Sequence, residues 1–276
     1  MMSIDHFPKS LFRSLLVPMA VTVFFPATLL ADDPAVTTDE VIYGDDAAPL
    51  NGYFAAPADL KADEMRPGIL VIHDWTGLQE YAKERTRQLA ELGFIAFAAD
   101  VYGKGVRPAN PQECGVQAGI YKSDRTLFRK RLNAALDVLK KHKHCDSENL
   151  AAIGYCFGGT GVIELARSGA DVKGIVSFHG GLDSPKPEDG KNIKAKVLIC
   201  HGADDPYVPE ESIDAFVKEM NDAGVDWQMI SYSGAVHSFT KPDAGDDNSK
   251  GAAYNKNADK RSWEHMRTFF KEVLGR

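Results

Sequence analysis

A cysteine lies between glycines directly after an apolar stretch near the middle of the chain. Residues 150–153 are apolar, residues 154–159 read Gly-Tyr-Cys-Phe-Gly-Gly, and residues 160–165 can open a helix. The pattern Gly-x-Cys-x-Gly between a strand and a helix is typical of a nucleophile elbow, here with cysteine in place of serine. The helix N-terminus would favour a thiolate at Cys156. For this motif alone, a buried structural cysteine in a glycine-rich turn is the alternative.

An acid and a histidine follow in the order expected of a nucleophile's partners. The apolar residues 197–200 lead to Asp204 and Asp205, and the apolar residues 227–232 lead to a loop that carries His237. Nucleophile, acid and base occur in this order in α/β-hydrolases, where the acid orients the histidine and the histidine moves protons. The order predicts nucleophilic catalysis by Cys156, with His237 as the base and one of the two aspartates as the third member.

The segments around these residues alternate between strands and helices. Continuous apolar strands of this kind are typical of a sheet that is buried on both faces. The alternation predicts one α/β domain with a doubly wound, mostly parallel sheet and helices on both faces. We expect strands at 41–43, 50–56, 69–72, 94–98, 150–153, 174–178, 196–200 and 227–232, helices at 79–92, 124–141 (capped by Ser123), 210–223 and 262–274, and a long polar loop at 243–257.

The first 31 residues are interpreted as a secretory signal peptide. Two basic residues precede a mostly apolar run at 15–30, and Ala31 is followed abruptly by Asp32. A basic start, an apolar middle and a small residue before a polar sequence is the organisation of such a peptide. The run is broken by prolines and is shorter than the ~20 apolar residues that a membrane span needs. We therefore expect residues 32–276 as the mature domain, periplasmic or secreted, with no stable membrane anchor after cleavage.

Composition and cysteine content narrow the class of protein. The chain is 44% hydrophobic and 26% charged, as in soluble globular proteins, and its formal net charge of -7 argues against a nucleic-acid partner. Its cysteines are Cys114, Cys145, Cys156 and Cys200. In an exported protein an even number of cysteines raises the question of disulfides, and Cys114 with Cys145 is the candidate pair if one forms. Cys200 ends an apolar strand and is expected to be buried.

From about Val41 to its end, the chain resembles the dienelactone hydrolase family. The cysteine elbow is the most specific of the shared motifs, because most α/β-hydrolases carry serine there. The resemblance implies an α/β-hydrolase fold and hydrolysis of a small ester or lactone through an acyl-enzyme intermediate, without a metal or an organic cofactor. The D-x-x-V-P motif selects Asp205 over Asp204 as the acid. The matching segments are 71–77 (Val-Ile-His-Asp-Trp-Thr-Gly), 99–103 (Ala-Asp-Val-Tyr-Gly), 154–159, 205–209 (Asp-Pro-Tyr-Val-Pro) and 236–239 (Val-His-Ser-Phe).

The same resemblance implies roles for residues near the nucleophile. The backbone N–H groups of Phe157 and of Trp75 would form the oxyanion hole. Asp74 stands where the family often has a glutamate that accepts the thiol proton, and it is one methylene shorter. It would therefore be the thiol-activating acid.

Three further residues are candidates for substrate binding. Lys104 and Lys241 stand where dienelactone-specific members use arginines to hold the substrate carboxylate. Lysine keeps the positive charge but loses the bidentate fork of arginine, which argues against dienelactone itself as the substrate. Both lysines could equally be solvated surface residues. His179 is expected to line the pocket.

Other functions are compatible with parts of this pattern. A broader carboxylesterase or thioesterase would use the same residues with a looser pocket, and a catalytically idle scaffold could serve as a binding protein. A metal site built from Cys156, Cys200, His201 and His237 lacks the spacing of metal-binding motifs. Cys200 and His201 would also face opposite ways within one strand.

Overall fold

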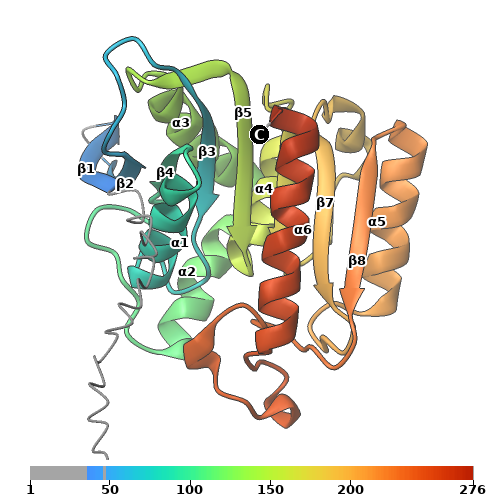
Figure 1. Ribbon diagram of the computed structural model, residues 1–276. Coiled ribbons are helices and arrows are strands. Elements are labelled where there is room, and N and C mark those ends of the chain that lie inside the picture. Colours follow the sequence, from blue (N-terminus) through green and yellow to red (C-terminus); the bar gives the residue numbers. More distant parts are fainter. Residues whose placement is uncertain (1–35, 46–47, 276) are drawn as a thin grey trace, which may run out of the picture. The chain divides into compact units, whose positions relative to one another are not determined.

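An eight-stranded sheet forms the centre of the described chain, which comprises residues 36–45 and 48–275 of the computed structural model (Figure 1). The strands lie in the order β1-β2-β4-β3-β5-β6-β7-β8. β2 is antiparallel to both of its neighbours, and the other paired strands are parallel. The strands are Val36–Asp45 (β1), Ala48–Pro57 (β2), Arg66–Ile72 (β3), Ile95–Ala99 (β4), Cys145–Tyr155 (β5), Gly174–Phe178 (β6), Lys196–Gly202 (β7) and Trp227–Tyr232 (β8).

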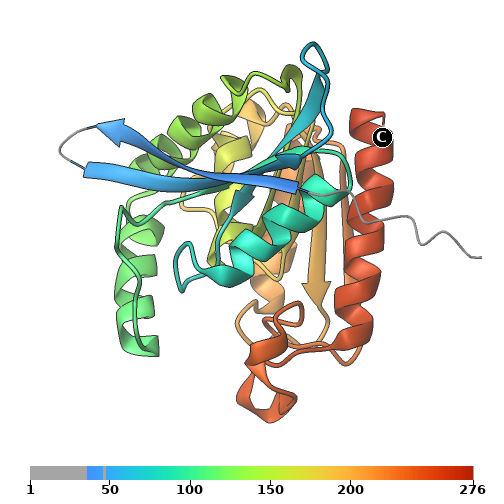
Figure 2. The ribbon, with the colours of Figure 1, turned by 60° about the vertical axis from the view of Figure 1, so that its left-hand side comes forward.

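Helices cover both faces of this sheet. α1 and α6 pack on one face, and α3, α4 and α5 pack on the other (Figure 1 and Figure 2). This arrangement confirms the predicted doubly wound, mostly parallel α/β fold. The helices are Glu80–Glu91 (α1), Pro111–Ser123 (α2), Arg125–Lys140 (α3), Phe157–Arg167 (α4), Glu210–Ala223 (α5) and Lys256–Leu274 (α6), and the short 3-10 helices are Pro187–Asn192 (η1), Pro242–Ala244 (η2) and Asn248–Lys250 (η3).

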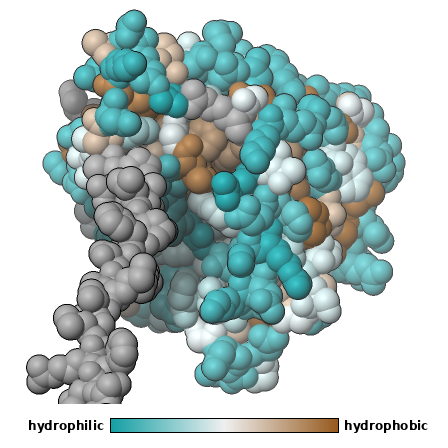
Figure 3. All heavy atoms as spheres, viewed as in Figure 1, coloured by the Kyte–Doolittle hydropathy of each residue, from teal (hydrophilic) through white to brown (hydrophobic). Residues whose placement is uncertain are grey.

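The central strand β3 contributes to the core on both faces. Successive side chains of a strand point to opposite sides, so Leu70 and Ile72 pack in the layer of α3 and α4, while Ile69 and Val71 pack in the layer of α1 and α6. All four are fully buried, which explains why the strand is continuously apolar. The outer surface on the side of α6 is mostly hydrophilic, because the apolar side chains of the helices face inward (Figure 3).

Helix boundaries differ from the sequence-based expectation at two places. Ser123 is the last residue of α2, and the cap of α3 is Asp124, whose side chain accepts a hydrogen bond from the Leu127 N–H at 2.9 Å. α6 begins at Lys256, inside the stretch that was predicted to be a polar loop, because Asn255 caps it. Polar residues that cap and open a helix lack the apolar period by which helices are predicted.

α2 is a helix that the sequence pattern does not predict. Gly115 and Gly119 lie within this helix, and few of its side chains are buried. Glycine lowers helix propensity, and the apolar pattern here is too weak to predict a helix. The available signal was at its start, where Asn110 caps the helix and Pro111 occupies its first position.

Two expectations concern export and disulfides. The signal peptide predicted over residues 1–31 lies outside the described residues. Within the described part of the chain, no helix is both long and apolar enough to cross a bilayer.

The disulfide considered between Cys114 and Cys145 is wrong, because both residues are free, buried thiols on separate elements. Cys114 lies in α2, whereas the sulfur of Cys145 packs into the core beside Gly68.

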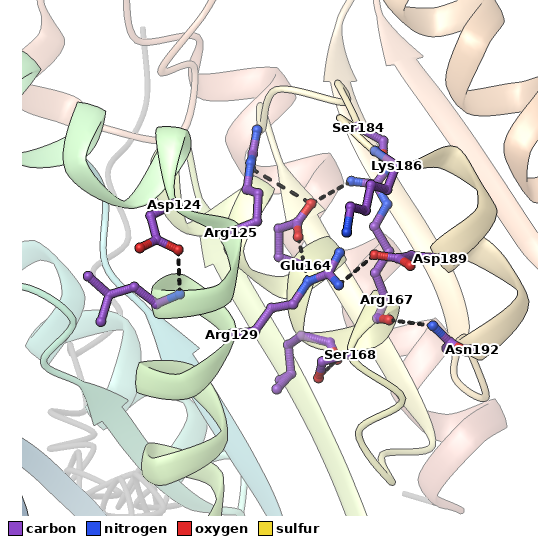
Figure 4. A network of polar contacts seen from close by, with 12 residues as sticks. Asp124, Arg125, Arg129, Glu164, Arg167, Ser168, Ser184, Lys186, Asp189 and Asn192 are labelled. Atoms are coloured by element: carbon purple, nitrogen blue, oxygen red, sulfur yellow. Dashed lines mark hydrogen bonds and ion pairs between the residues drawn. The ribbon is translucent and has the colours of Figure 1, made fainter.

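A buried network of ion pairs joins α4 to the elements around it (Figure 4). Arg167 is fully buried, donates to Glu164 Oε1 at 2.9 Å and binds both carboxylate oxygens of Glu219 in α5 at 2.8 and 2.6 Å. Arg129 of α3 binds the other oxygen of Glu164 at 2.8 Å and pairs with Asp189 at 2.6 Å. The network therefore fixes the helix that the glycine-rich motif opens, together with the loop at 180–192.

Replacing Glu164 with Gln should lower the free energy of unfolding by about 3 kcal/mol, because Arg167 and Arg129 would keep their charges in a buried place with one carboxylate fewer. Urea denaturation measures this change. The matched control is Asp222→Asn, which removes the exposed ion pair of Lys218 with Asp222 and should change stability by less than about 1 kcal/mol. Equal effects of the two substitutions would contradict the importance of the buried network.

Candidate active site

The residues that the sequence singles out gather at the carboxyl-terminal edge of the sheet. Asp74 follows β3, Cys156 follows β5, Asp205 follows β7, and His237 lies on the loop after β8. Parallel strands place their carboxyl ends at the same edge, which is where open α/β sheets bind their ligands. Residues that are far apart in the sequence therefore become neighbours.

Cys156 lies in a sharp turn between β5 and α4. Among the described residues, Cys156, His179 and Ser238 are the non-glycine residues with positive φ, at 53°, 40° and 57°. Side chains disfavour this left-handed backbone, and residues held in it concentrate at functional sites. All three lie around the same turn, which marks this edge of the sheet as the place where the fold is strained.

The glycines of the motif are required by close packing of backbone. A Cβ at Gly158 would collide with the carbonyl oxygen of Ile72 in β3, and a Cβ at Gly154 would collide with the carbonyl oxygen of Gly158. The first turn of α4 therefore crosses directly over the ends of β3 and β5. This crossing exposes the side chain of Cys156 at the edge of the sheet.

Cys156, His237 and Asp205 form a continuous chain of hydrogen bonds. The Cys156 sulfur lies 3.0 Å from His237 Nε2, and His237 Nδ1 lies 2.8 Å from Asp205 Oδ2. The other oxygen of Asp205 accepts from the Tyr207 N–H at 2.9 Å, and the Asp205 side chain is fully buried. Asp204 is exposed, so of the two adjacent acids it is Asp205 that the structure brings to the histidine.

The environment of His237 favours its charged form. Burial by itself would lower the pKa of His237, but its contacts with the Cys156 sulfur and the Asp205 carboxylate outweigh burial and raise this pKa from 6.5 to about 10. An imidazolium therefore lies beside the sulfur at neutral pH. Such a pair is the arrangement that makes a cysteine nucleophilic, because the thiolate is the reactive species.

The long polar segment before α6 holds the backbone of His237. The His237 N–H donates to the carbonyl of Gly251 at 3.2 Å, and the His237 carbonyl accepts from the N–H of Ala253 at 3.0 Å. Tyr207 packs edge-on against the His237 ring, and its hydroxyl donates to the carbonyl of Lys250 at 3.2 Å. The segment thus positions the histidine.

Cys156 and His237 open into a pocket of about 370 Å³. Trp75, Phe157, Tyr207 and Val208 give it a mostly apolar lining, and Lys122 and Thr160 contribute polar groups. Phe157 is the first residue of α4, and N–H groups in the first turn of a helix have no acceptor within it. Phe157 and Trp75 thus line the pocket together with Cys156.

Asp74 is held by its own loop and by Lys241. One carboxylate oxygen accepts from the Thr76 N–H at 2.7 Å, and the other pairs with Lys241 Nζ at 2.9 Å. Burial opposes the charge of Lys241, but the Asp74 carboxylate outweighs burial and raises the pKa of Lys241. Both oxygens of Asp74 therefore already have partners. The pair stabilises the loop that carries Trp75.

The three candidate substrate-binding residues fall in different places. Lys241 lines an adjoining cavity of about 350 Å³, and Trp75 lines both this cavity and the main pocket. Lys104 is exposed and lines neither cavity. The expectation that His179 lines the pocket is wrong, because its ring is 2% exposed and lies beneath the turn of Cys156. The end of β6 directs this ring inward.

Lys122 is a pocket residue that sequence reasoning missed. It lies in the last turn of α2 and borders the pocket near Gly181. No motif contains it, and α2 itself was not predicted. Among the described residues, no group of three His, Cys, Asp or Glu side chains is placed to hold a metal ion.

Known proteins resemble this chain over most of its length. The model of the Dienelactone hydrolase family matches residues 50–274. The solved structure of m3DLH superposes with a TM-score of 0.83 at 40% identity, over 87% of this chain and 99% of that one. A dienelactone hydrolase-like promiscuous phosphotriesterase from metagenomic libraries superposes with a TM-score of 0.81 at 40% identity, over the same shares of the two chains. Protein usf of Aquifex pyrophilus is 28% identical over 213 residues, covering 75% of this chain and 89% of that protein.

Gly158→Ala should destabilise the protein by several kcal/mol, about 3 or more, because the added Cβ meets the backbone of β3 and cannot be accommodated by a side-chain movement. Urea denaturation measures the change. Gly115→Ala is the matched control, since a Cβ there in α2 meets nothing within 4 Å and alanine favours a helix by up to about 1 kcal/mol. Comparable stability of the two variants would refute the close crossing of α4 over β3.

Proposed function

This chain belongs to the dienelactone hydrolase family, and from that membership we propose that it hydrolyses a carboxylic ester or lactone by nucleophilic attack of Cys156. The observation that carries the proposal is the hydrogen-bond chain from the Cys156 sulfur through His237 to Asp205, with distances of 3.0 and 2.8 Å. An accessible sulfur beside an imidazolium can attack a carbonyl carbon without further activation.

The proposed reaction has two stages. The Cys156 thiolate forms a bond to the carbonyl carbon, and the carbonyl electron pair moves to the oxygen, which the N–H groups of Phe157 and Trp75 stabilise. Collapse of this intermediate breaks the bond to the alkoxy oxygen, which takes a proton from His237 Nε2. His237 then removes a proton from water, which attacks the thioester carbon, and cleavage of the carbon–sulfur bond releases the carboxylic acid and returns Cys156 as the thiolate beside the His237 imidazolium. Asp205 orients the imidazole and stabilises its positive charge.

The lining of the pocket limits the substrate class. A volume of about 370 Å³ with aromatic walls suits a small acyl or lactone group, and Lys122 can bind a negatively charged end of it. Asp74 keeps Lys241 away from this role in the structure. The phosphotriesterase among the similar structures adds phosphotriesters to the substrates that are worth testing.

The first test is hydrolysis of a short p-nitrophenyl ester and a panel of lactones, before and after treatment with iodoacetamide. Cys156→Ala and His237→Ala should each lower kcat by roughly 10³-fold or more, and Asp205→Asn by less, because the imidazole keeps part of its orientation without the acid. Cys114→Ala is the matched control, since that thiol lies outside the main pocket. It should keep full activity and remain sensitive to iodoacetamide.

Each result decides between candidate functions. Full esterase activity in Cys156→Ala would disprove the nucleophile. Broad activity on esters and thioesters would indicate a carboxylesterase with a loose pocket. Activity on no ester, lactone or phosphotriester, with Cys156 still reactive toward iodoacetamide, would favour a scaffold that binds without catalysis.

Trp75→Ala should widen the range of substrates, because Trp75 lines both the main pocket and the adjoining cavity, and loss of its indole should enlarge the space open to an acyl chain. We expect the ratio of kcat/KM for p-nitrophenyl octanoate to that for the acetate to rise roughly tenfold. Trp227→Ala, a change of the same size on β8 far from the pocket, should leave the ratio unchanged. An unchanged ratio in Trp75→Ala would show that the adjoining cavity does not take up the acyl chain of these esters.

A further inference from the structure

A second imidazole lies behind the nucleophile, on the side away from the pocket. His179 follows β6, is 2% exposed and has a φ of 40°. It does not belong to the residues that line the pocket, so it cannot touch a substrate bound there. Its ring packs against His237 with ring centres 5.2 Å apart and against Phe239 at 5.1 Å. It is therefore a buried titratable group that the proposed reaction does not use directly.

The hydrogen bonds of His179 determine where its proton lies. The Cys156 N–H donates to His179 Nδ1 at 3.2 Å, and it is shared with the carbonyl of Phe178 at 3.0 Å. A backbone amide can only donate, so Nδ1 carries the lone pair and Nε2 carries the proton. Nε2 lies 2.7 Å from Thr240 Oγ1 and donates to it. The Thr240 hydroxyl, 2.6 Å from the hydroxyl of Tyr81, is then free to donate there.

Thr240 is itself held firmly. It is 1% exposed, and its carbonyl accepts from Arg85 Nη2 at 2.9 Å. Arg85 lies in α1 and pairs with Asp259 of α6 at 2.6 Å. Thr240 thus anchors the segment that begins at His237 to two helices of the same layer.

We propose that His179 is a positioning residue that sets the distance between the Cys156 sulfur and His237 Nε2. Its imidazole binds the main chain of the nucleophile through one nitrogen and the His237 segment, at Thr240, through the other. One rigid ring therefore joins the two segments whose side chains must meet. The inference rests on the proposed function, because it concerns the same reacting pair.

The surroundings keep His179 neutral, as this role requires. Burial, reinforced by the positive charge of His237, lowers the pKa of His179 well below its usual value, and the more distant charges of Arg85 and Lys241 act in the same direction. A protonated His179 would turn an Nδ1–H toward the Cys156 N–H, and two donors cannot bind each other. The link between the two segments holds only for the neutral ring.

The experiment compares Thr240→Val, which keeps the shape of the side chain but removes its hydroxyl, with Thr240→Ser, which keeps the hydroxyl. We expect Thr240→Val to lower kcat about tenfold, because His179 Nε2–H loses its acceptor, and a loss of about 1.4 kcal/mol corresponds to this factor. KM should stay within about twofold, since neither Thr240 nor His179 contacts the pocket. The pH profile for alkylation of Cys156 by iodoacetamide should move toward that of an ordinary thiol, and Thr240→Ser should restore both properties.

Thr86→Val is the matched control, because Thr86 is also fully buried but donates only within its own helix, to Ala82. A wild-type kcat and alkylation profile in Thr240→Val, an equal loss in Thr86→Val, or no rescue by Thr240→Ser would each overturn the proposal. If the wild type hydrolyses no ester or lactone, the proposed function fails, but the alkylation profiles still decide whether the link through His179 sets the reactivity of Cys156.

Discussion

The left-handed backbone of Cys156 is the constraint on which the rest of the site depends. A residue with a side chain in such a rarely populated, positive-φ conformation loses roughly 1–3 kcal/mol, so the turn persists only where the surrounding structure leaves no alternative. Here α4 crosses over the ends of β3 and β5 so closely that Gly154 and Gly158 admit no side chain. The ion pairs of Glu164 and Arg167 hold the same helix from its other end. The fold thus aims the sulfur at His237.

Two histidines at this site show how a partner determines charge. His237 and His179 are both largely buried, and burial disfavours the positive charge of each. The carboxylate of Asp205 and the sulfur of Cys156 reverse this effect for His237 and raise its pKa to about 10. His179 faces an amide and a hydroxyl in place of a carboxylate, so burial and the positive charge of His237 together lower its pKa. One imidazole can therefore move protons while the other can only hold its neighbours in place.

The sequence predicted those parts of the structure that depend on local patterns. Apolar strands followed by helices are enough to predict the α/β sheet, and the nucleophile motif is local because strand, turn and helix are adjacent in the chain. The position of His179 was not predictable from the sequence. A histidine directly after this strand could place its ring in the pocket or beneath the turn of Cys156, and the sequence is the same in both cases. Lys104 and Lys241 illustrate the same limit. Whether a lysine meets the substrate depends on a distant partner such as Asp74, which no spacing reveals.

The group of Cys156, His237 and Asp205 and part of the pocket wall come from different elements of this fold. The sulfur, the histidine and the acid follow strands whose ends the sheet brings to one edge, so their arrangement is bound to the core. Part of the pocket wall comes instead from α2, which carries Lys122, from the loop at 180–192, and from the polar segment that includes Ala252. These segments contribute little to the core, and their sequences carry no motif. Lys241 is paired with Asp74. The lysine that remains for a negatively charged substrate is therefore Lys122, on the helix α2 that the sequence pattern does not predict. This part of the pocket lining can therefore change without disturbing the turn of Cys156.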